Sequence, residues 1–125
     1  MRLLLDCHAL FWALADPPNL SATAREAILD EDNAVFYSPI GLYEMVFKAS
    51  RGRAPAEALT LPLAAGRAEF DEVTLTTEHF LHAARMDWSH GDPWDRIVLA
   101  QAMLEDMRLV SADRAFDAVT DRRLW

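Results

Sequence analysis

The sequence predicts an α/β fold, and two observations lead to this prediction. Short apolar segments typical of strands alternate along the chain with longer segments typical of helices, as in proteins built on a mainly parallel sheet. The three consecutive leucines at positions 3–5 favour a strand that is covered on both faces. Because crossovers between parallel strands are right-handed, helices should cover both faces of the sheet. We therefore expect a three-layer α/β/α sandwich with four to five strands.

The first half of the chain is expected to contain two strands, each followed by helix. The first helix should end at the polar, proline-containing segment 16–19. Ser21 and Ser38 each precede a helical segment and are suitable N-caps, and Pro39 suits the first helical position. The expected elements are a strand at 2–5, a helix at 7–14, a helix from Ser21 to about 30, a strand at 34–37 and a helix from Ser38 that stops near 51–53.

The second half continues the alternation. Pro55 and Pro62 limit helix formation, so the segment 55–63 is expected to be irregular. Thr76 or Thr77 is expected to cap a helix. The other expected elements are a helix at 63–70, a strand at 72–75, a helix that starts at 92–93 and ends near 106–107, a strand at 108–111 and a helical turn at 114–117. With no repeat or internal linker, residues 1–125 are expected to form a single domain.

The segment 90–102 is the most informative part of the chain, because it places acids at the start of an apolar helix. Asp92 is a good N-cap, Pro93 suits the first helical position, and Asp95 lies near the positive end of the helix dipole. A carboxylate at the start of a buried helix is costly unless a partner neutralises it. One interpretation is that Asp92 and Asp95 only stabilise the helix start. The other is that they belong to a site that binds a cation.

Four acids occupy comparable places relative to the expected sheet. Asp6 and Asp113 each follow a strand, Glu44 lies on the helix after the second strand, and Asp95 starts the helix before the fourth. In a parallel sheet these positions can converge at one edge. Carboxylates about 4 Å apart repel by about 4 kcal/mol at an effective dielectric constant of about 20, so such a cluster needs protons or a cation. Oxygen ligands favour Mg²⁺ or Mn²⁺, which suit phosphodiester hydrolysis. The alternative for Glu44 is an ion pair with Lys48.

The composition restricts the classes of function. A formal net charge of −8 argues against simple electrostatic binding of nucleic acid, and it is compatible with a carboxylate cluster or a basic partner segment. The single cysteine, Cys7, excludes an internal disulfide and suggests a reducing compartment. No apolar run approaches the roughly 20 residues that span a bilayer, and the acid at position 6 comes too early for a signal peptide. A cytoplasmic protein is expected.

Four segments, spread over nearly the whole chain, carry a distinctive set of motifs. They are LLLDCH at 3–8, SPIGLYEMVFK at 38–48, HGDPWDR at 90–96 and LVSAD at 109–113. Together they resemble the PIN-domain family, and most closely its VapC-type toxin ribonucleases. The resemblance implies an endoribonuclease that depends on Mg²⁺ or Mn²⁺ and leaves 5′-phosphate and 3′-hydroxyl ends. It also implies inhibition by an antitoxin whose basic or aromatic tail enters the acidic groove, and commonly a homodimer.

The resemblance also implies roles for individual residues. Matched position by position, the catalytic, metal-binding acids are Asp6, Glu44, Asp95 and Asp113. Asp92 matches a supporting acid of the same motif, and Ser111 matches a small hydroxyl residue that could orient water or phosphate. The chain departs from the family pattern at Cys7, where Thr or Ser is usual, and at Tyr43, where Trp is frequent. Positions 91 and 94 are modest variations.

Several other side chains have less specific interpretations. The best basic candidates for contacts with RNA phosphates are Lys48, Arg51, Arg53 and Arg96, and ion pairs with nearby acids are an equal alternative. Trp12, Trp88 and Trp94 are interpreted as core or dimer contacts rather than as platforms for base stacking. His8 is interpreted as a residue of the helix start rather than a catalytic base, and Cys7 as a small buried residue.

Two other functions remain compatible with these residues. A catalytically weak PIN-like module could bind RNA or a protein partner without cutting, although the presence of all four acids argues against it. A phosphatase with Asp6 as its nucleophile would need a second Asp two residues later, where the chain has His8.

Overall fold

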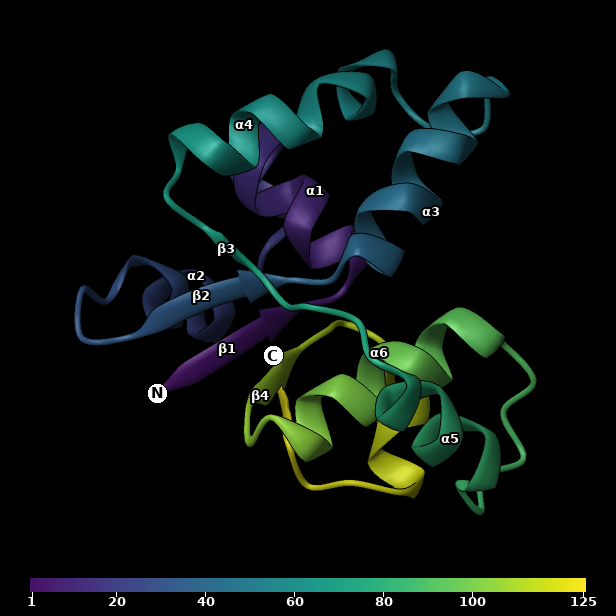
Figure 1. Ribbon diagram of the computed structural model, residues 1–125. Coiled ribbons are helices and arrows are strands. Elements are labelled where there is room, and N and C mark those ends of the chain that lie inside the picture. Colours follow the sequence, from purple (N-terminus) through teal and green to yellow (C-terminus); the bar gives the residue numbers. More distant parts are fainter.

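The computed structural model describes residues 1–125 and has the expected three layers, with a parallel sheet between two sets of helices (Figure 1). The strands are β1 (Arg2–Leu5), β2 (Ala34–Tyr37), β3 (Asp71–Glu72), β4 (Arg108–Val110) and β5 (Arg123–Leu124). They are hydrogen-bonded in the order β3-β2-β1-β4-β5, and every pairing is parallel. All strands therefore end at the same edge of the sheet, with β1 in the centre.

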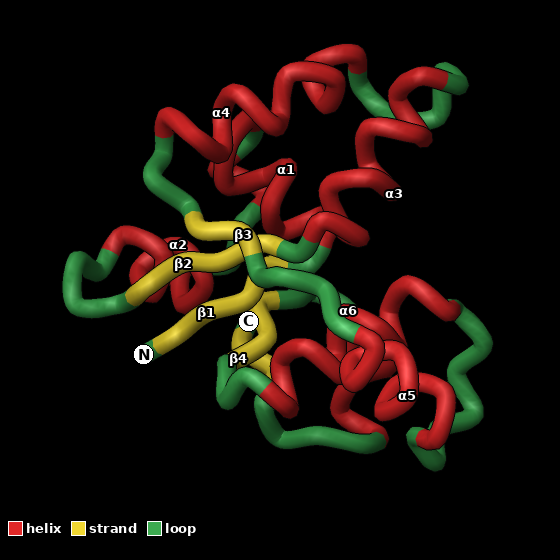
Figure 2. The backbone as a smooth tube through the Cα atoms, viewed as in Figure 1, coloured by secondary structure: helices red, strands yellow, loops and turns green.

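Helices lie on both faces of this sheet, and short 3₁₀ turns connect them (Figures 1 and 2). The helices are α1 (Cys7–Ala15), α2 (Ala22–Leu29), α3 (Pro39–Ser50), α4 (Leu61–Arg67), α5 (Thr77–Arg85) and α6 (Pro93–Leu104). The 3₁₀ turns are η1 (Pro17–Asn19), η2 (Ala56–Thr60) and η3 (Arg114–Ala118). In Figure 1, α1, α3 and α4 lie above the sheet, and α5 and α6 lie below it. None of these helices is both long and apolar enough to cross a membrane.

The central strand supplies both faces of the core, as its three leucines predicted. Leu4 packs with Leu99 of α6 and Phe116 of η3 on one face. Leu3 and Leu5 point to the other face, where α1 and α2 cover them. All three side chains are buried, and full burial of a leucine stabilises a fold by about 1.5–3 kcal/mol. A third cluster joins α1, α3, η2 and α4 beyond the sheet.

The helix starts follow the capping residues that the sequence indicated. Ser21 accepts a hydrogen bond from the Ala24 amide at 3.0 Å, and Ser38 accepts one from the Ile40 amide at 3.1 Å. Asp92 caps α6. These side chains satisfy amides that have no partner within the helix. The buried run 98–102 of α6 is also as expected.

Several sequence-based expectations differ from the structure, most of them in short elements, and α6 ends at Leu104 rather than near 106–107. Strand β3 is Asp71–Glu72 rather than 72–75, and α4 begins at Leu61, because Pro62 stands in its first turn, where a missing N–H costs nothing. The two-residue strand β5 was not located from the sequence. The segment 55–63 is partly regular, since it contains η2 and the start of α4.

Candidate functional site

Asp6 stands where the central strand ends and α1 begins. Its carboxylate accepts a hydrogen bond from the Ala9 amide at 2.7 Å, so the same residue caps the helix. Burial raises the pKa of Asp6, and the negative charge of Asp113 adds to the rise, while hydrogen bonds from Ser111 and Ala9 oppose it. An acid whose ionised form is disfavoured by burial is one that a bound cation would stabilise.

Ser111 and Asp113 follow the neighbouring strand β4 and face Asp6. The Ser111 side chain is buried, and its proximity to the Asp6 carboxylate lowers the pKa of Asp6. Its oxygen accepts a hydrogen bond from the Asp113 amide at 3.0 Å. Asp113 is exposed and caps η3 through the Ala115 amide at 2.8 Å. Ser111 therefore lies beside Asp6 and fixes the loop that carries Asp113.

Asp95 lies in the first turn of α6, where its carboxylate contacts a histidine. His90 Nε2 lies 2.7 Å from Asp95 Oδ2. Burial raises the pKa of Asp95, the hydrogen bond from His90 lowers it, and the charges of Asp92 and Glu44 raise it. His90, Asp95 and Asp113 each offer one ligand atom, and these atoms lie within 4.8 Å of one another. This is the tightest group of potential metal ligands in the structure.

The sequence indicated no role for His90, which lies in the loop before α6. The ring stacks on Trp88 with centroids 4.5 Å apart. The loop returns to the helix start because Arg96 binds its carbonyl groups. The sequence feature that could have identified His90 is its separation of five residues from Asp95. This spacing permits a contact only if the loop folds back onto the helix start.

Glu44 approaches the site from α3. Only 13% of its side chain is exposed, and it accepts a hydrogen bond from Lys48 Nζ at 2.9 Å. The ion pair considered from the sequence is therefore present. The charge of Glu44 nevertheless contributes to the raised pKa of Asp95, so the residue also faces the acidic centre. Glu44 and Asp6 are not members of the tight group around His90.

Asp92 holds the first turn of α6 in place. Its carboxylate accepts hydrogen bonds from the Trp94 amide at 2.9 Å and from the Asp95 amide at 3.4 Å. The capping interpretation of Asp92 is therefore confirmed, and the cation-binding interpretation stays a prediction. Asp92 is a structural cap, and Asp95 shares its surroundings with three other acids.

The basic candidates divide into different roles, and the expectation for Arg96 is wrong. Its guanidinium donates hydrogen bonds to the backbone carbonyls of residues 83, 86, 88 and 90, so it fixes the loop before α6 instead of facing RNA. Lys48 is paired with Glu44. Arg51 lies over the Phe47 ring, 5.2 Å from its centroid. Arg53 is exposed and lines two cavities next to the site.

Cys7 and the tryptophans also have distinct environments. Cys7 is buried, and burial together with the charges of Asp6 and Glu44 raises the pKa of its thiol, which stays protonated. Trp88 packs against Phe116 in the core, as expected. Trp94 is not in the core, since 38% of it is exposed.

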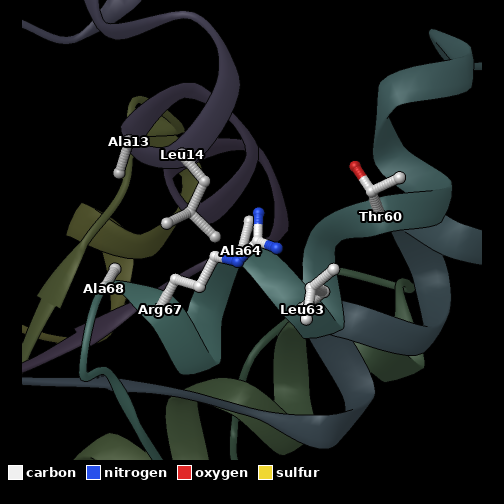
Figure 3. Close-up of a pocket in the computed structure, with 7 residues that line it drawn as sticks. All are labelled: Ala13, Leu14, Thr60, Leu63, Ala64, Arg67 and Ala68. Atoms are coloured by element: carbon white, nitrogen blue, oxygen red, sulfur yellow. The ribbon is translucent and has the colours of Figure 1, made fainter.

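Cavity volume by itself does not identify the acidic centre. A cavity of about 410 Å³ between α1 and α4 contains none of the predicted site residues (Figure 3). Figure 3 shows Leu14 and Arg67 converging on it from these two helices. Two cavities of similar size border the acidic centre instead. One is lined by His8, Trp12, Lys48 and Arg53 among others, and the second includes Glu44 and Asp92.

The chain also matches known proteins in sequence. The model of the PIN domain family matches residues 3–122. Ribonuclease VapC22 of Mycobacterium tuberculosis is 31% identical over 116 residues, which cover 89% of this chain and 86% of that protein.

Solved structures of toxin–antitoxin proteins share the fold. VapBC2 of Rickettsia felis, bound to a DNA fragment from its promoter, gives a TM-score of 0.74 at 14% identity, with both chains fully covered. VapBC-1 of nontypeable Haemophilus influenzae gives 0.69 at 17% identity, covering 97% of this chain and 94% of that one. A family match over nearly the whole chain, together with this fold, gives one conclusion: the chain belongs to the PIN domain family.

Proposed function

We propose that this protein is a VapC-type toxin, an endoribonuclease that hydrolyses RNA phosphodiester bonds and is inhibited by a cognate antitoxin. Family membership and the similarity to a VapC ribonuclease support the proposal. The observation that carries it is the convergence of acids from separate elements at the edge where the parallel strands end. At that edge, burial and neighbouring negative charge raise the pKa of Asp6 and of Asp95.

The donor set fits a hard divalent cation, Mg²⁺ or Mn²⁺. The residues that would hold it are Asp6, Glu44, Asp95 and Asp113, with His90 adjacent. Carboxylate oxygens are the ligands that such ions prefer, and a bound cation would stabilise the ionised forms of Asp6 and Asp95, which burial disfavours. When bound, such an ion lowers the pKa of water and neutralises charge on a phosphate.

The chain's own residues prepare this site before any substrate binds. Ser111 fixes the Asp113 loop, and the Ala9 amide holds the Asp6 carboxylate. Asp92 fixes the first turn of α6, and with it the position of Asp95. Asp113 is exposed, so the acidic centre is open to a large substrate. Such preorganisation avoids a rearrangement during the reaction.

The decisive experiment compares RNA cleavage by the wild-type protein and by Asp6→Asn in the presence of Mg²⁺ or Mn²⁺. Asn is as good an N-cap as Asp, so α1 keeps its start while the site loses a charge. Because changes to outer-shell partners of metal ligands already cost about 10–100-fold, we expect a loss on the order of 100-fold or more. Asp32→Asn, which removes a charge from an exposed turn, is the control. Full activity of a folded Asp6→Asn protein would refute the proposal.

A catalytically weak RNA- or partner-binding module is the second candidate. Two contacts favour it, because Lys48 neutralises Glu44 and His90 occupies one oxygen of Asp95. A protein that binds Mn²⁺ in calorimetry but cuts no RNA with either ion would support this candidate.

For partners, we propose a cognate antitoxin, a homodimer and a cytoplasmic location. Solved relatives are toxin–antitoxin complexes, and the net charge of −8 suits a basic inhibitory segment. The free thiol of Cys7 suits a reducing compartment. Co-expression with the product of an adjacent short gene, followed by light scattering of the purified complex, tests the first two points.

A further inference from the structure

A cavity of about 430 Å³ lies beside the acidic centre, between α3 and the first turn of α6. Its walls combine aromatic rings, cations and two acids. The lining residues are Tyr43, Glu44, Phe47, Lys48, Arg53, Asp92 and Trp94. Because Glu44 is one of the acids proposed to hold the metal, the cavity shares a wall residue with that site.

The aromatic wall is exposed and comes from two different helices. Tyr43, Phe47 and Trp94 are 54%, 40% and 38% exposed. The Tyr43 and Phe47 rings are stacked, with centroids 5.7 Å apart, and Trp94 meets Tyr43 edge-on at 6.2 Å. Trp94 lies in the helix turn that Asp92 caps, so its backbone is fixed. Rings held in this way offer flat apolar faces without the cost of ordering a loop.

Positive charges accompany these rings. Lys48 and Arg53 line the same cavity, and the Arg51 guanidinium lies over the Phe47 ring. This arrangement combines aromatic faces for bases with cations for phosphates, which is how proteins bind single-stranded nucleic acid. The lining acids and cations are equal in number, but Glu44 pairs with Lys48. The exposed side chains of Arg53 and the adjacent Arg51 therefore give this wall a local positive charge that suits a phosphate better than a basic antitoxin segment.

We propose that Trp94 and Tyr43 form a stacking subsite for a nucleobase of the RNA, with Arg53 contacting the phosphate beside it. The inference rests on the proposed function and adds to it the position of a neighbouring nucleotide. The earlier interpretation of Trp94 as a core or dimer contact is replaced by this role.

The test measures binding without cleavage. A fluorescein-labelled single-stranded RNA octamer and an abasic chain of the same length and charge are titrated with protein in EDTA at low salt, because phosphate contacts weaken with salt. Stacking of one base should make the octamer bind on the order of 10-fold more tightly than the abasic chain. Trp94→Ala should abolish this difference, and Trp94→Phe should retain most of it. Phe80→Ala, which removes an equally exposed ring from α5, should leave it unchanged.

Several results would overturn the subsite. One is equal affinity of the wild-type protein for the octamer and the abasic chain. Another is that Trp94→Ala lowers the affinity for both chains by the same factor. Unchanged binding by Trp94→Ala with an altered oligomeric state in light scattering would identify the face as a contact between protein copies. Failure of the proposed function would give a different result from failure of the subsite. A protein that cleaves no RNA with Mg²⁺ or Mn²⁺ would still bind the octamer more tightly than the abasic chain in EDTA.

Discussion

The two ends of α6 each carry a contact between a histidine and a carboxylate, and they differ in how the histidine is held. At the C-terminal end, His79 is 1% exposed, its Nε2 lies 2.9 Å from Glu105, and its Nδ1 accepts a hydrogen bond from the Thr76 amide. At the N-terminal end, the ring of His90 hydrogen-bonds Asp95 alone and is partly exposed. The first imidazole is satisfied at both nitrogens and joins α5 to α6. The second stands at an open acidic centre.

Removing the carboxylate at the N-terminal end should have the largest effect on activity. We expect Asp95→Asn to lower RNA cleavage by on the order of 100-fold or more, because a proposed metal ligand is lost. The variant should be at least as stable as the wild type at neutral pH without metal. Burial raises the pKa of Asp95, so its charge opposes folding above the ordinary pKa.

The matched control is Glu105→Gln, whose amide oxygen can still accept the hydrogen bond from His79. Its cleavage rate should equal that of the wild type. Equal losses in the two variants would show that the ends of α6 are not functionally different.

Removing the buried imidazole should have the largest effect on stability. His79→Ala leaves a cavity and removes the partner of the Thr76 amide, so we expect the free energy of unfolding to fall by about 3 kcal/mol. Urea titration followed by circular dichroism measures it. His82→Ala, on the same helix but partly exposed, should cost far less.

The same substitution at the open end should cost less. We expect His90→Ala to lower the free energy of unfolding by about 1 kcal/mol or less, because partly exposed ion pairs contribute little. If urea titration gave the same loss as for His79→Ala, the distinction between a structural and a site histidine would be wrong.

The smallest expected effect is on stability, at Asp117, an exposed acid that is already paired with Arg123. Arg123 lowers the pKa of Asp117 through hydrogen bonds of 2.7 and 2.8 Å. A lowered pKa in the folded state gives stability above the unfolded pKa, near 3.8, that is lost as the pH falls through the folded value. The melting temperature of the wild type should therefore exceed that of Asp117→Asn at pH 7 and converge with it in acid. If the difference in melting temperature did not change with pH, the Asp117–Arg123 pair would not be its source.

The comparison also shows which parts of the molecule are predictable from sequence. Helix α6 could be predicted because its cap, its proline and its apolar run are all local signals. The approach of Asp6 to Asp113 could be predicted because both follow strands of a parallel sheet, whose ends meet at one edge.

The elements that escaped prediction depend on contacts between distant residues. Strand β5 has too few residues to show a period, and Arg108 positions it by binding the carbonyls of Arg122 and Arg123. Arg96 appeared to be a free surface cation, yet loop carbonyls occupy its guanidinium. His90 became a site residue only through that loop. Local patterns do not encode such contacts, because they form only when the loop and the helix are both in place.

The position of β1 has a consequence for how the protein is made. Asp6 is the first of the four acids to emerge from the ribosome, but its amide binds the Val110 carbonyl of β4, and the Ser111 side chain lowers the pKa of its carboxyl. A growing chain that stops before these residues has the first acid but neither the strand that holds it nor the hydroxyl beside it. The acidic centre therefore forms only once β4 and the residues after it have been made, and we expect a chain truncated before them to cleave no RNA.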